Sequence, residues 1–457
     1  MTKLPLVDII IVYQLKGNNF VMEIYVSKFG GSSLADAEQF KKVKEIITAD
    51  SRRIFIVPSA PGKRFKDDTK VTDMLYSAYD ALSKGKDYDF SVIENRYRSI
   101  ISELGLKVDL EQDFAHIKNC FIAKAGRDFA ASRGEYLNGK LLSEYLGFEF
   151  VDAAEVVFFK ADGSFDEETT YSVMGERLKN SKGAVIPGFY GAMPNDTIRT
   201  FSRGGSDITG SIVARAVNAT LCENWTDVDG FLMADPRIID DPKPIDVITY
   251  RELRELSYMG ATVLHEDAIF PVRSAGIPIN IRNTNHPSAK GTMIVPFPKA
   301  DHIPGAITGI AGKKGFAEII IEKGMMNQEL GFGRRILWAF EKNGVSFEHL
   351  PSGIDTMSVI VDEKAFDAKK EKILADIDEL TSPDNVFVQY GLALIAVVGR
   401  GMVKAKGTAN KIFRAVFESG VNVKMIDQGS SELNIIIGVD SEDFEKAMRG
   451  IYKAVMN

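Results

Sequence analysis

The chain has 457 residues, of which 45% are hydrophobic and 26% charged, a composition that predicts a soluble globular protein of about two to four domains. Its net charge of −7, with acidic and basic residues interspersed, argues against a nucleic-acid partner. No apolar run approaches the roughly 18 residues that a membrane span needs. The only cysteines, Cys120 and Cys222, exclude a disulfide framework and a cysteine-built metal site, and favour the reducing cytoplasm.

The segment 1–21 is predicted to be an N-terminal extension without catalytic residues. Its short apolar run is interrupted by Asp8 and is followed by no small-residue cleavage site, which argues against a secretory signal. Met22 then opens a compact strand pattern, and a glycine-rich turn follows that strand directly.

From residue 22 to about residue 300, apolar strand-like runs alternate with helical patterns, which predicts an α/β/α three-layer domain. The stretch "VSKFGGSSLADAEQF" places Lys28 at a strand end, before Gly30 and Gly31 and a helix. Backbone N–H groups, the helix start and the lysine charge would together suit a phosphate. So short a motif is equally consistent with an ordinary tight turn. A second glycine turn, "FSRGGSD" with Arg203 and Asp207, favours the phosphate site.

The C-terminal third of the chain contains an internal repeat. "GFGRRILWAFEKNGVSFEHLPSG" aligns with "GTANKIFRAVFESGVNVKMIDQG" without a gap, so that Gly331 corresponds to Gly407 and Gly353 to Gly429. We expect the same separation along the chain, that between Gly331 and Gly407, for two further pairs of segments. These are the upstream strands "AEIII" and "ALIAV" and the downstream strands "SVIV" and "NIII". Each copy is predicted to run strand, helix, strand, strand, and the segment 296–305 is predicted to be the linker before them.

Four stretches of the large domain resemble the aspartate kinase family of the amino acid kinase superfamily. They are "KFGGSS", "FSRGGSD", "WTDVDGFLMADPR" and "ELSYMGATVLHEDA", in the family's order and spacing. The terminal repeats look like the family's ACT domains. The resemblance implies a kinase domain at residues 22–300 and two ferredoxin-like ACT modules at 305–380 and 385–457. Because the chain ends there, we expect a monofunctional enzyme without a homoserine dehydrogenase domain.

The reaction that the resemblance implies is transfer of the ATP γ-phosphoryl group to the side-chain carboxylate of L-aspartate. It gives 4-phospho-L-aspartate, the first step toward lysine, threonine and methionine. Phosphoryl transfer between two anions needs positive charge, backbone donors and Mg²⁺ more than a base, and the Mg²⁺ would be bound mainly through ATP phosphates. The residues implied are catalytic Lys28 and Asp207; phosphate-binding Gly30, Gly31 and Ser32; nucleotide-binding Thr226, Asp227, Asp229 and Arg237; and aspartate-binding Ser59, Thr72, Glu135 and Arg203.

By this resemblance Lys28 neutralises the transferred group, and Asp207 organises the lysine or the metal. An aspartate at a helix start is otherwise often only a cap. Arg203 would pair with the α-carboxylate of the substrate and Glu135 with its α-ammonium group.

Three further positions have alternatives. Ser59 could be only a turn residue and Thr72 only a helix cap. Thr262 stands where many relatives have a lysine that contacts ATP, and Lys290 is a candidate to supply the missing charge.

The ACT-like modules imply feedback inhibition by an end product, with L-lysine as the expected effector and threonine as the alternative. The predicted pocket contains Met326, Gly331, Phe347 and Glu348, the last suited to a lysine ε-ammonium. Without the resemblance, Glu348 would be interpreted as a solvated strand carboxylate. We expect a homodimer or homotetramer formed through these modules.

Two other functions fit parts of the sequence. A catalytically silent amino-acid sensor would be expected to lose Lys28, Arg203 or Asp207, yet all three are present. Another acyl-phosphate-forming amino acid kinase, such as a glutamate or acetylglutamate kinase, would lack the "WTDVDG" stretch and the paired ACT modules.

Overall fold

The computed structural model of the chain describes residues 23–202, 204–260, 264, 268–297 and 306–456. The predicted extension at 1–21, Arg203, Thr262 and most of the predicted linker lie outside the described residues. The chain divides into two units, Met1–Thr200 with Ile212–Glu223, and Phe201–Ser211 with Asn224–Asn457. In the part of the chain that the structure describes, no helix is both long and apolar enough to span a bilayer.

The first unit is built on strands in the order β3, β4, β2, β1 and β7. Their bounds are β1 Tyr25–Phe29, β2 Arg53–Pro58, β3 Glu149–Phe150, β4 Ala184–Val185 and β7 Leu221–Thr226, of which β7 continues into the second unit. The pairs β1–β2, β2–β4 and β3–β4 are parallel. Every residue of β1 is buried, as expected for a strand that is covered on both faces.

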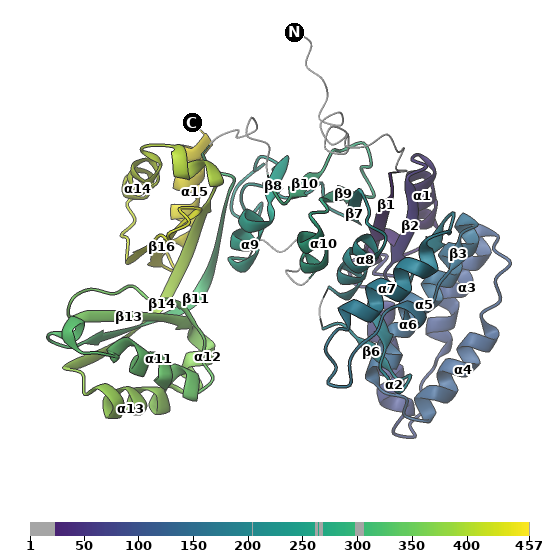
Figure 1. Cartoon of the computed structure of the whole chain (residues 1–457), viewed down its shortest axis with the longest axis horizontal. Coiled ribbons are helices and arrows are strands. Elements are labelled where there is room, and N and C mark those ends of the chain that lie inside the picture. Colours follow the sequence, from purple (N-terminus) through teal and green to yellow (C-terminus); the bar gives the residue numbers. More distant parts are fainter. Residues whose placement is uncertain (1–22, 203, 261–263, 265–267, 298–305, 457) are drawn as a thin grey trace, which may run out of the picture. The chain divides into compact units, whose positions relative to one another are not determined.

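Helices cover these strands, and α1 and α5 both pack against β2 (Figure 1). The helices of this unit are α1 Ala37–Thr48, α2 Val71–Leu82, α3 Ser91–Leu104, α4 Glu111–Ile122, α5 Arg127–Leu146, α6 Ala153–Val156 and α7 Glu167–Leu178. The side chain of Asp36 caps α1 by accepting a hydrogen bond from the Gln39 N–H. A two-stranded sheet, β5 Tyr190–Ala192 with β6 Ile198–Thr200, completes the unit.

In the second unit, the strands of the kinase region have the order β7, β9, β10 and β8. Its elements here are α8 Gly205–Ala216, which ends in the first unit, β8 Val247–Thr249, α9 Tyr250–Tyr258, α10 Phe270–Ala275, β9 Ile279–Asn283 and β10 Thr292–Val295. Helix α9 begins with a capping box, in which the side chains of Thr249 and Glu252 each accept a hydrogen bond from the backbone N–H of the other residue.

The two C-terminal modules of this unit share one sheet, in the order β12, β13, β11, β14, β16 and β15. The strands are β11 Gly309–Glu322, β12 Phe347–His349, β13 Thr356–Asp362, β14 Asn385–Val398, β15 Met425–Asp427 and β16 Asn434–Asp440. The helices are α11 Phe332–Lys342, α12 Glu363–Asp367, α13 Lys370–Thr381, α14 Thr408–Glu418 and α15 Phe444–Met456. Each copy therefore has the predicted order of strand, helix, strand, strand.

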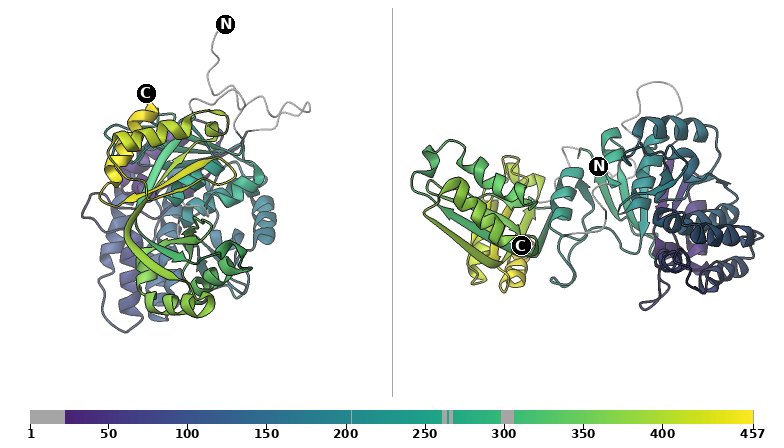
Figure 2. Two further views of the ribbon diagram at one scale, coloured as in Figure 1. Left: turned by 90° about the vertical axis from the view of Figure 1, so that its left-hand side faces the viewer. Right: turned by 90° about the horizontal axis from the view of Figure 1, so that it is seen from below.

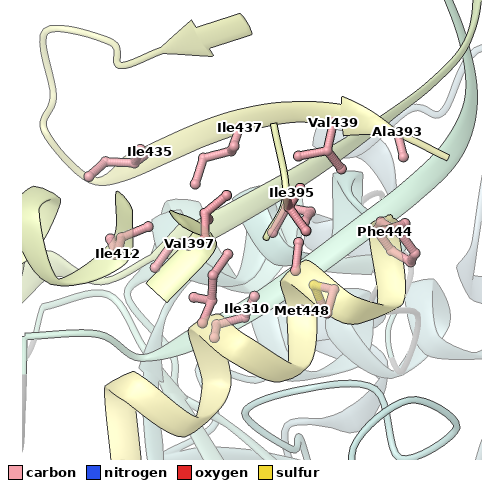
Figure 3. Packing of buried hydrophobic residues seen from close by; sticks show 14 of the residues in the cluster. Ile310, Ala393, Ile395, Val397, Ile412, Ile435, Ile437, Val439, Phe444 and Met448 are labelled. Atoms are coloured by element: carbon pink, nitrogen blue, oxygen red, sulfur yellow. The ribbon is translucent and has the colours of Figure 1, made fainter. Parts of the chain in front are cut away.

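Strands β11 and β14 serve both modules (Figures 1 and 2). Residues 316–322 pair with 385–392 and with β13, whereas residues 309–314 pair with 393–398, which in turn pair with β16. The core of the second module accordingly includes Ile307 and Ile310, and Figure 3 shows Ile310 packed with Ile395 and Val397. The first module is thus inserted between two strands of the second.

A single separation along the chain was predicted between equivalent residues of the two copies. That separation is correct for the first strands, β11 and β14, and wrong for the last strands, β13 and β16. Ala317 of the first copy corresponds to Ala393 of the second, and their strand partners are Val361 and Val439. The two partners are farther apart along the chain than the two alanines, because the second module is longer by two residues between these strands. Since side chains alternate with a period of two, such a shift keeps every apolar residue on the same face and is invisible in the pattern.

Candidate functional site

The first glycine turn follows directly from β1. Gly30 is extended and Gly31–Leu34 form one 3-10 turn, η3. A Cβ atom on Gly31 would meet the Ala60 carbonyl oxygen at 2.9 Å, and one on Gly62 would meet the Gly31 carbonyl carbon at 2.5 Å. The two segments therefore pack backbone against backbone, which neither glycine could do with a side chain. Lys28 is only 8% exposed, more buried than a strand-end lysine usually is.

The segment after β2 joins this turn to helix α5. The Ser59 N–H donates to the Phe29 carbonyl oxygen at 3.0 Å, and the Ser59 carbonyl oxygen accepts from Asn138 Nδ2 at 2.7 Å. The Ala60 N–H donates to the carboxylate of Glu135. Ser59 and Glu135, which the sequence analysis assigned to the same substrate, are thus connected through one short stretch of backbone.

Glu135 is a buried carboxyl group with a strongly shifted pKa. Burial raises its pKa to about 8, although the Ala60 N–H and the charges of Arg133 and Lys28 oppose the shift. Its Oε2 atom has no hydrogen-bond partner among the residues that the structure describes. A buried carboxylate with an unused acceptor is suited to bind a cation.

Thr72 lies in the first turn of α2, but it is not the cap of that helix. The N-cap position is occupied by Lys70, whose side chain makes no capping hydrogen bond. The alternative interpretation of Thr72 as a helix cap is therefore wrong, while its proposed contact with aspartate stays a prediction.

In the second unit, Asp207 lies in the first turn of α8. Its Oδ1 atom accepts a hydrogen bond from Asn224 Nδ2 at 3.0 Å. Asn224 is a buried residue of β7 that the sequence analysis missed. The available signal was its position immediately before the "WTDVDG" motif. Arg203, the predicted clamp for the α-carboxylate, lies outside the described residues.

The predicted nucleotide loop follows β7. Thr226 Oγ1 donates to Asp227 Oδ1 at 3.1 Å, and Asn283 Nδ2 donates to Asp229 Oδ1 at 2.9 Å. His286 Nδ1 lies 3.4 Å from the Asp229 carboxylate. Asn283 and His286 were not predicted. Three of the four predicted nucleotide residues therefore gather with side chains from the end of β9 and the segment that follows it.

Arg237, the fourth predicted nucleotide residue, is bound elsewhere. Its Nη2 lies 2.7 Å from the Asp235 carboxylate, and its side chain is 84% exposed. Lys290, the candidate to supply the charge that is missing at Thr262, is exposed as well. Within the described ranges, no group of three or more His, Cys, Asp and Glu side chains is placed to hold a metal ion.

Comparison with known proteins decides the family. Residues 23–283 match the model of the amino acid kinase family, and residues 395–455 match an ACT domain. Aspartokinase 3 of Bacillus subtilis is 41% identical over 449 residues, which cover 94% of this chain and 98% of that protein. The chain belongs to the aspartokinase family.

Solved aspartokinases have the same fold. The Clostridium acetobutylicum aspartate kinase is 53% identical, with a TM-score of 0.87 over 95% of this chain and 100% of that chain. Escherichia coli aspartokinase III in complex with aspartate and ADP is 23% identical, with a TM-score of 0.74 over the same shares, a likeness of fold alone. The chain is thus an aspartokinase-type enzyme with ACT modules, as the sequence motifs indicated.

In this aspartokinase, the four predicted effector residues are not equally placed. Met326 packs into the core of the first module, and its N–H donates to the Lys323 carbonyl oxygen. Gly331 is the N-cap of α11 with φ 77°. Phe347 and Glu348 lie on the edge strand β12, with Phe347 exposed.

The helix α9 of the kinase domain contacts both ACT modules. The Tyr258 hydroxyl donates to the Glu348 carboxylate in the first module. Glu252, fully buried, accepts from Arg400 Nη1 at 2.7 Å and from the Thr308 hydroxyl at 2.5 Å, both next to strands of the second module. The predicted effector carboxylate is therefore hydrogen-bonded to the kinase domain directly.

Proposed function

We propose that this aspartokinase transfers the γ-phosphoryl group of ATP to the side-chain carboxylate of L-aspartate, which gives 4-phospho-L-aspartate and ADP. The observation that carries the proposal is Glu135, a buried carboxylate with an unused oxygen beside the first glycine turn. An α-ammonium group would satisfy that oxygen and lower the pKa of the carboxyl group. A substrate with both an ammonium group and an acceptor carboxylate fits this demand.

The first glycine turn would hold the phosphates. When bound, ATP with Mg²⁺ supplies the phosphoryl group and part of the charge neutralisation. The N–H groups of Gly31 and Ser32 then donate to phosphate oxygens, Gly30 leaves the space open, and the ammonium of Lys28 stabilises charge on the transferred group. The burial of Lys28 supports this role, because the interaction of a charge with a phosphate is stronger away from water.

The remaining assignments complete the two substrate sites. Asp207, held by Asn224, orients Lys28 or the metal. Thr226, Asp227 and Asp229 contact the ribose and base of the nucleotide. Ser59, Thr72 and Arg203 contact aspartate, with Arg203 on the α-carboxylate. Arg237 contacts phosphate only after its guanidinium leaves Asp235.

We further propose that the ACT modules mediate feedback inhibition by L-lysine, with the ε-ammonium on Glu348. The crystal structure of Escherichia coli aspartokinase III in complex with lysine and aspartate, whose fold this chain shares, is consistent with that choice. Lysine would compete with the Tyr258 hydroxyl for the carboxylate. Inhibition requires that lysine bind the inactive arrangement better than the active one, and pairing of chains through the ACT modules would transmit it.

The test is an assay of ADP release with a panel of acceptors. The proposal predicts turnover with L-aspartate, and little turnover with L-glutamate or N-acetylglutamate. Turnover with one of those acceptors and not with aspartate would favour another acyl-phosphate-forming kinase. Lysine binding without any turnover would favour a silent sensor.

A further inference from the structure

A buried ion pair of the first unit has no part in the sites described above. Arg96 of α3 and Asp68, in the loop after β2, are 4% and 8% exposed. Arg96 Nη1 lies 2.7 Å from Asp68 Oδ2. The other terminal nitrogen, Nη2, donates to the Gly62 carbonyl oxygen. One guanidinium thus binds both ends of the loop segment 62–68.

Arg64 closes the same segment from within. Its backbone N–H and its Nε both donate to Asp68 Oδ2, at 3.0 Å and 2.8 Å, and its Nη2 donates to Oδ1 at 3.0 Å. These hydrogen bonds from Arg64, and then the charge of Arg96, hold the pKa of the Asp68 carboxyl group well below its usual range despite burial. Hydrogen bonds and ion pairs therefore join the two ends of the loop segment 62–68.

The far side of Gly62 touches the first glycine turn. The Gly62 N–H donates to the Gly31 carbonyl oxygen at 2.8 Å. A Cβ atom on Gly62 would also come within 2.8 Å of the Ser32 nitrogen. Arg96 is thus bound to the carbonyl of the residue whose N–H orients Gly31.

The same stretch of backbone holds Glu135. Shortly before Gly62 in the chain, the N–H of Ser59 donates to the Phe29 carbonyl oxygen and that of Ala60 donates to the Glu135 carboxylate. A shift of this segment would move the phosphate turn and the carboxylate together. Arg96 therefore binds the segment whose hydrogen bonds link the phosphate turn to Glu135.

Stability alone gives a poor reason for this ion pair. Burying two charges costs several kcal/mol per ion, and an apolar pair of equal volume is often as stable or more so. A guanidinium offers instead a fixed fork that binds a carboxylate and a carbonyl at a set distance.

We propose that Arg96, held by Asp68, is a positioning residue for phosphoryl transfer, which fixes Gly62 against Gly31 and so sets the phosphate-binding turn. The inference rests on the proposed function of that turn. Arg96 touches no substrate. It acts through the Gly62 carbonyl, and its loss should affect ligands that carry the terminal phosphates more than ligands that do not.

The test compares Arg96→Gln with Glu94→Gln in the full-length enzyme. Glu94 is a buried residue of the same helix, and its ion pair with Lys118 of α4 does not involve the loop. Arg96→Gln should lower kcat/KM for ATP by about 100-fold, the usual loss for a displacement of roughly 1 Å at a reacting group. Adenosine binding, measured by calorimetry, should not change. Glu94→Gln should retain wild-type kcat/KM for ATP.

Hydrogen exchange of the backbone N–H groups of residues 59–70 distinguishes a local effect on this segment from a loss of overall stability. It should accelerate in Arg96→Gln and stay at the wild-type rate in Glu94→Gln. If Arg96→Gln does not fold, Asp68→Asn, which keeps the shape of the side chain but removes the ion pair, carries the same test.

The outcomes distinguish the positioning role of Arg96 from the phosphate-binding role of the glycine turn. If wild type prefers ATP over adenosine and Arg96→Gln keeps the same preference and turnover, the positioning role is overturned. Equal losses for ATP and adenosine in Arg96→Gln would overturn it as well, because they indicate a merely structural residue. If wild type itself does not discriminate ATP from adenosine, the phosphate role of the glycine turn is contradicted.

Discussion

The raised pKa of Glu135 makes the pH dependence of aspartate use predictable. Only the ionised carboxylate can bind the α-ammonium group. With a pKa of about 8 in the free enzyme, Glu135 is ionised in roughly one tenth of molecules at about pH 7 and in roughly nine tenths at about pH 9. We therefore expect kcat/KM for aspartate to rise about tenfold over this range, because that parameter reports the free enzyme.

The same shift predicts an opposite effect on stability. The folded pKa lies above the unfolded value of 4.5, so the favourable contribution is complete below about pH 4.5 and is lost as the pH rises to about 8. The loss amounts to at most about 5 kcal/mol for a shift of this size. Glu135→Gln removes the charge and keeps the shape. It should be more stable than wild type at about pH 9, yet bind aspartate poorly.

The assay is kcat/KM for aspartate at saturating ATP across this pH range, with urea unfolding of both proteins at about pH 9. The matched control is kcat/KM for ATP at saturating aspartate, which should vary much less with pH. A flat aspartate profile, together with a Glu135→Gln variant that is less stable than wild type at about pH 9, would refute the reasoning.

Four other residues have distinct expected effects. Lys28→Met, which keeps the buried stem, should abolish turnover without loss of fold by circular dichroism, and near-normal activity would remove Lys28 from the mechanism. Asn224→Ala should lower kcat more than it raises KM, because Asp207 loses its 3.0 Å hydrogen bond, and an effect on KM alone would reject that role. Glu348→Ala should keep catalysis but raise the lysine concentration for half inhibition about tenfold, equal to roughly 1.4 kcal/mol, whereas inhibition by threonine alone would show that the effector is wrong. Tyr258→Phe should increase lysine sensitivity, because the competing hydroxyl is gone, and an unchanged response would separate Tyr258 from regulation.

Contiguous motifs made the fold predictable, and the same motifs contain most of the residues proposed for the site. Lys28, Gly30 and Gly31 are close neighbours in sequence, and a glycine pair after an apolar strand has few structural explanations. The repeat was detectable because apolar positions recur in both copies. These features depend on residues that are close together in the sequence, so they can be recognised from one sequence alone.

The features that were missed depend on contacts between distant segments. Nothing near Arg96 in the sequence indicates that its guanidinium binds the Gly62 carbonyl, 34 residues away. Asn224 reaches Asp207 across 17 residues for the same reason. The insertion of one ACT module into the other follows from how residues 309–314 pair, which periodicity does not specify. Such contacts are set by tertiary packing rather than by local pattern.

The central claim is that the acceptor atom is a side-chain carboxylate oxygen of L-aspartate. Its product is an acyl phosphate, which hydroxylamine converts to a stable hydroxamate with release of phosphate. Incubation of the full-length enzyme with ATP, Mg²⁺, L-aspartate and hydroxylamine should give the β-hydroxamate of aspartate in an amount equal to the ADP formed. ADP formation without any aspartate hydroxamate would contradict the account.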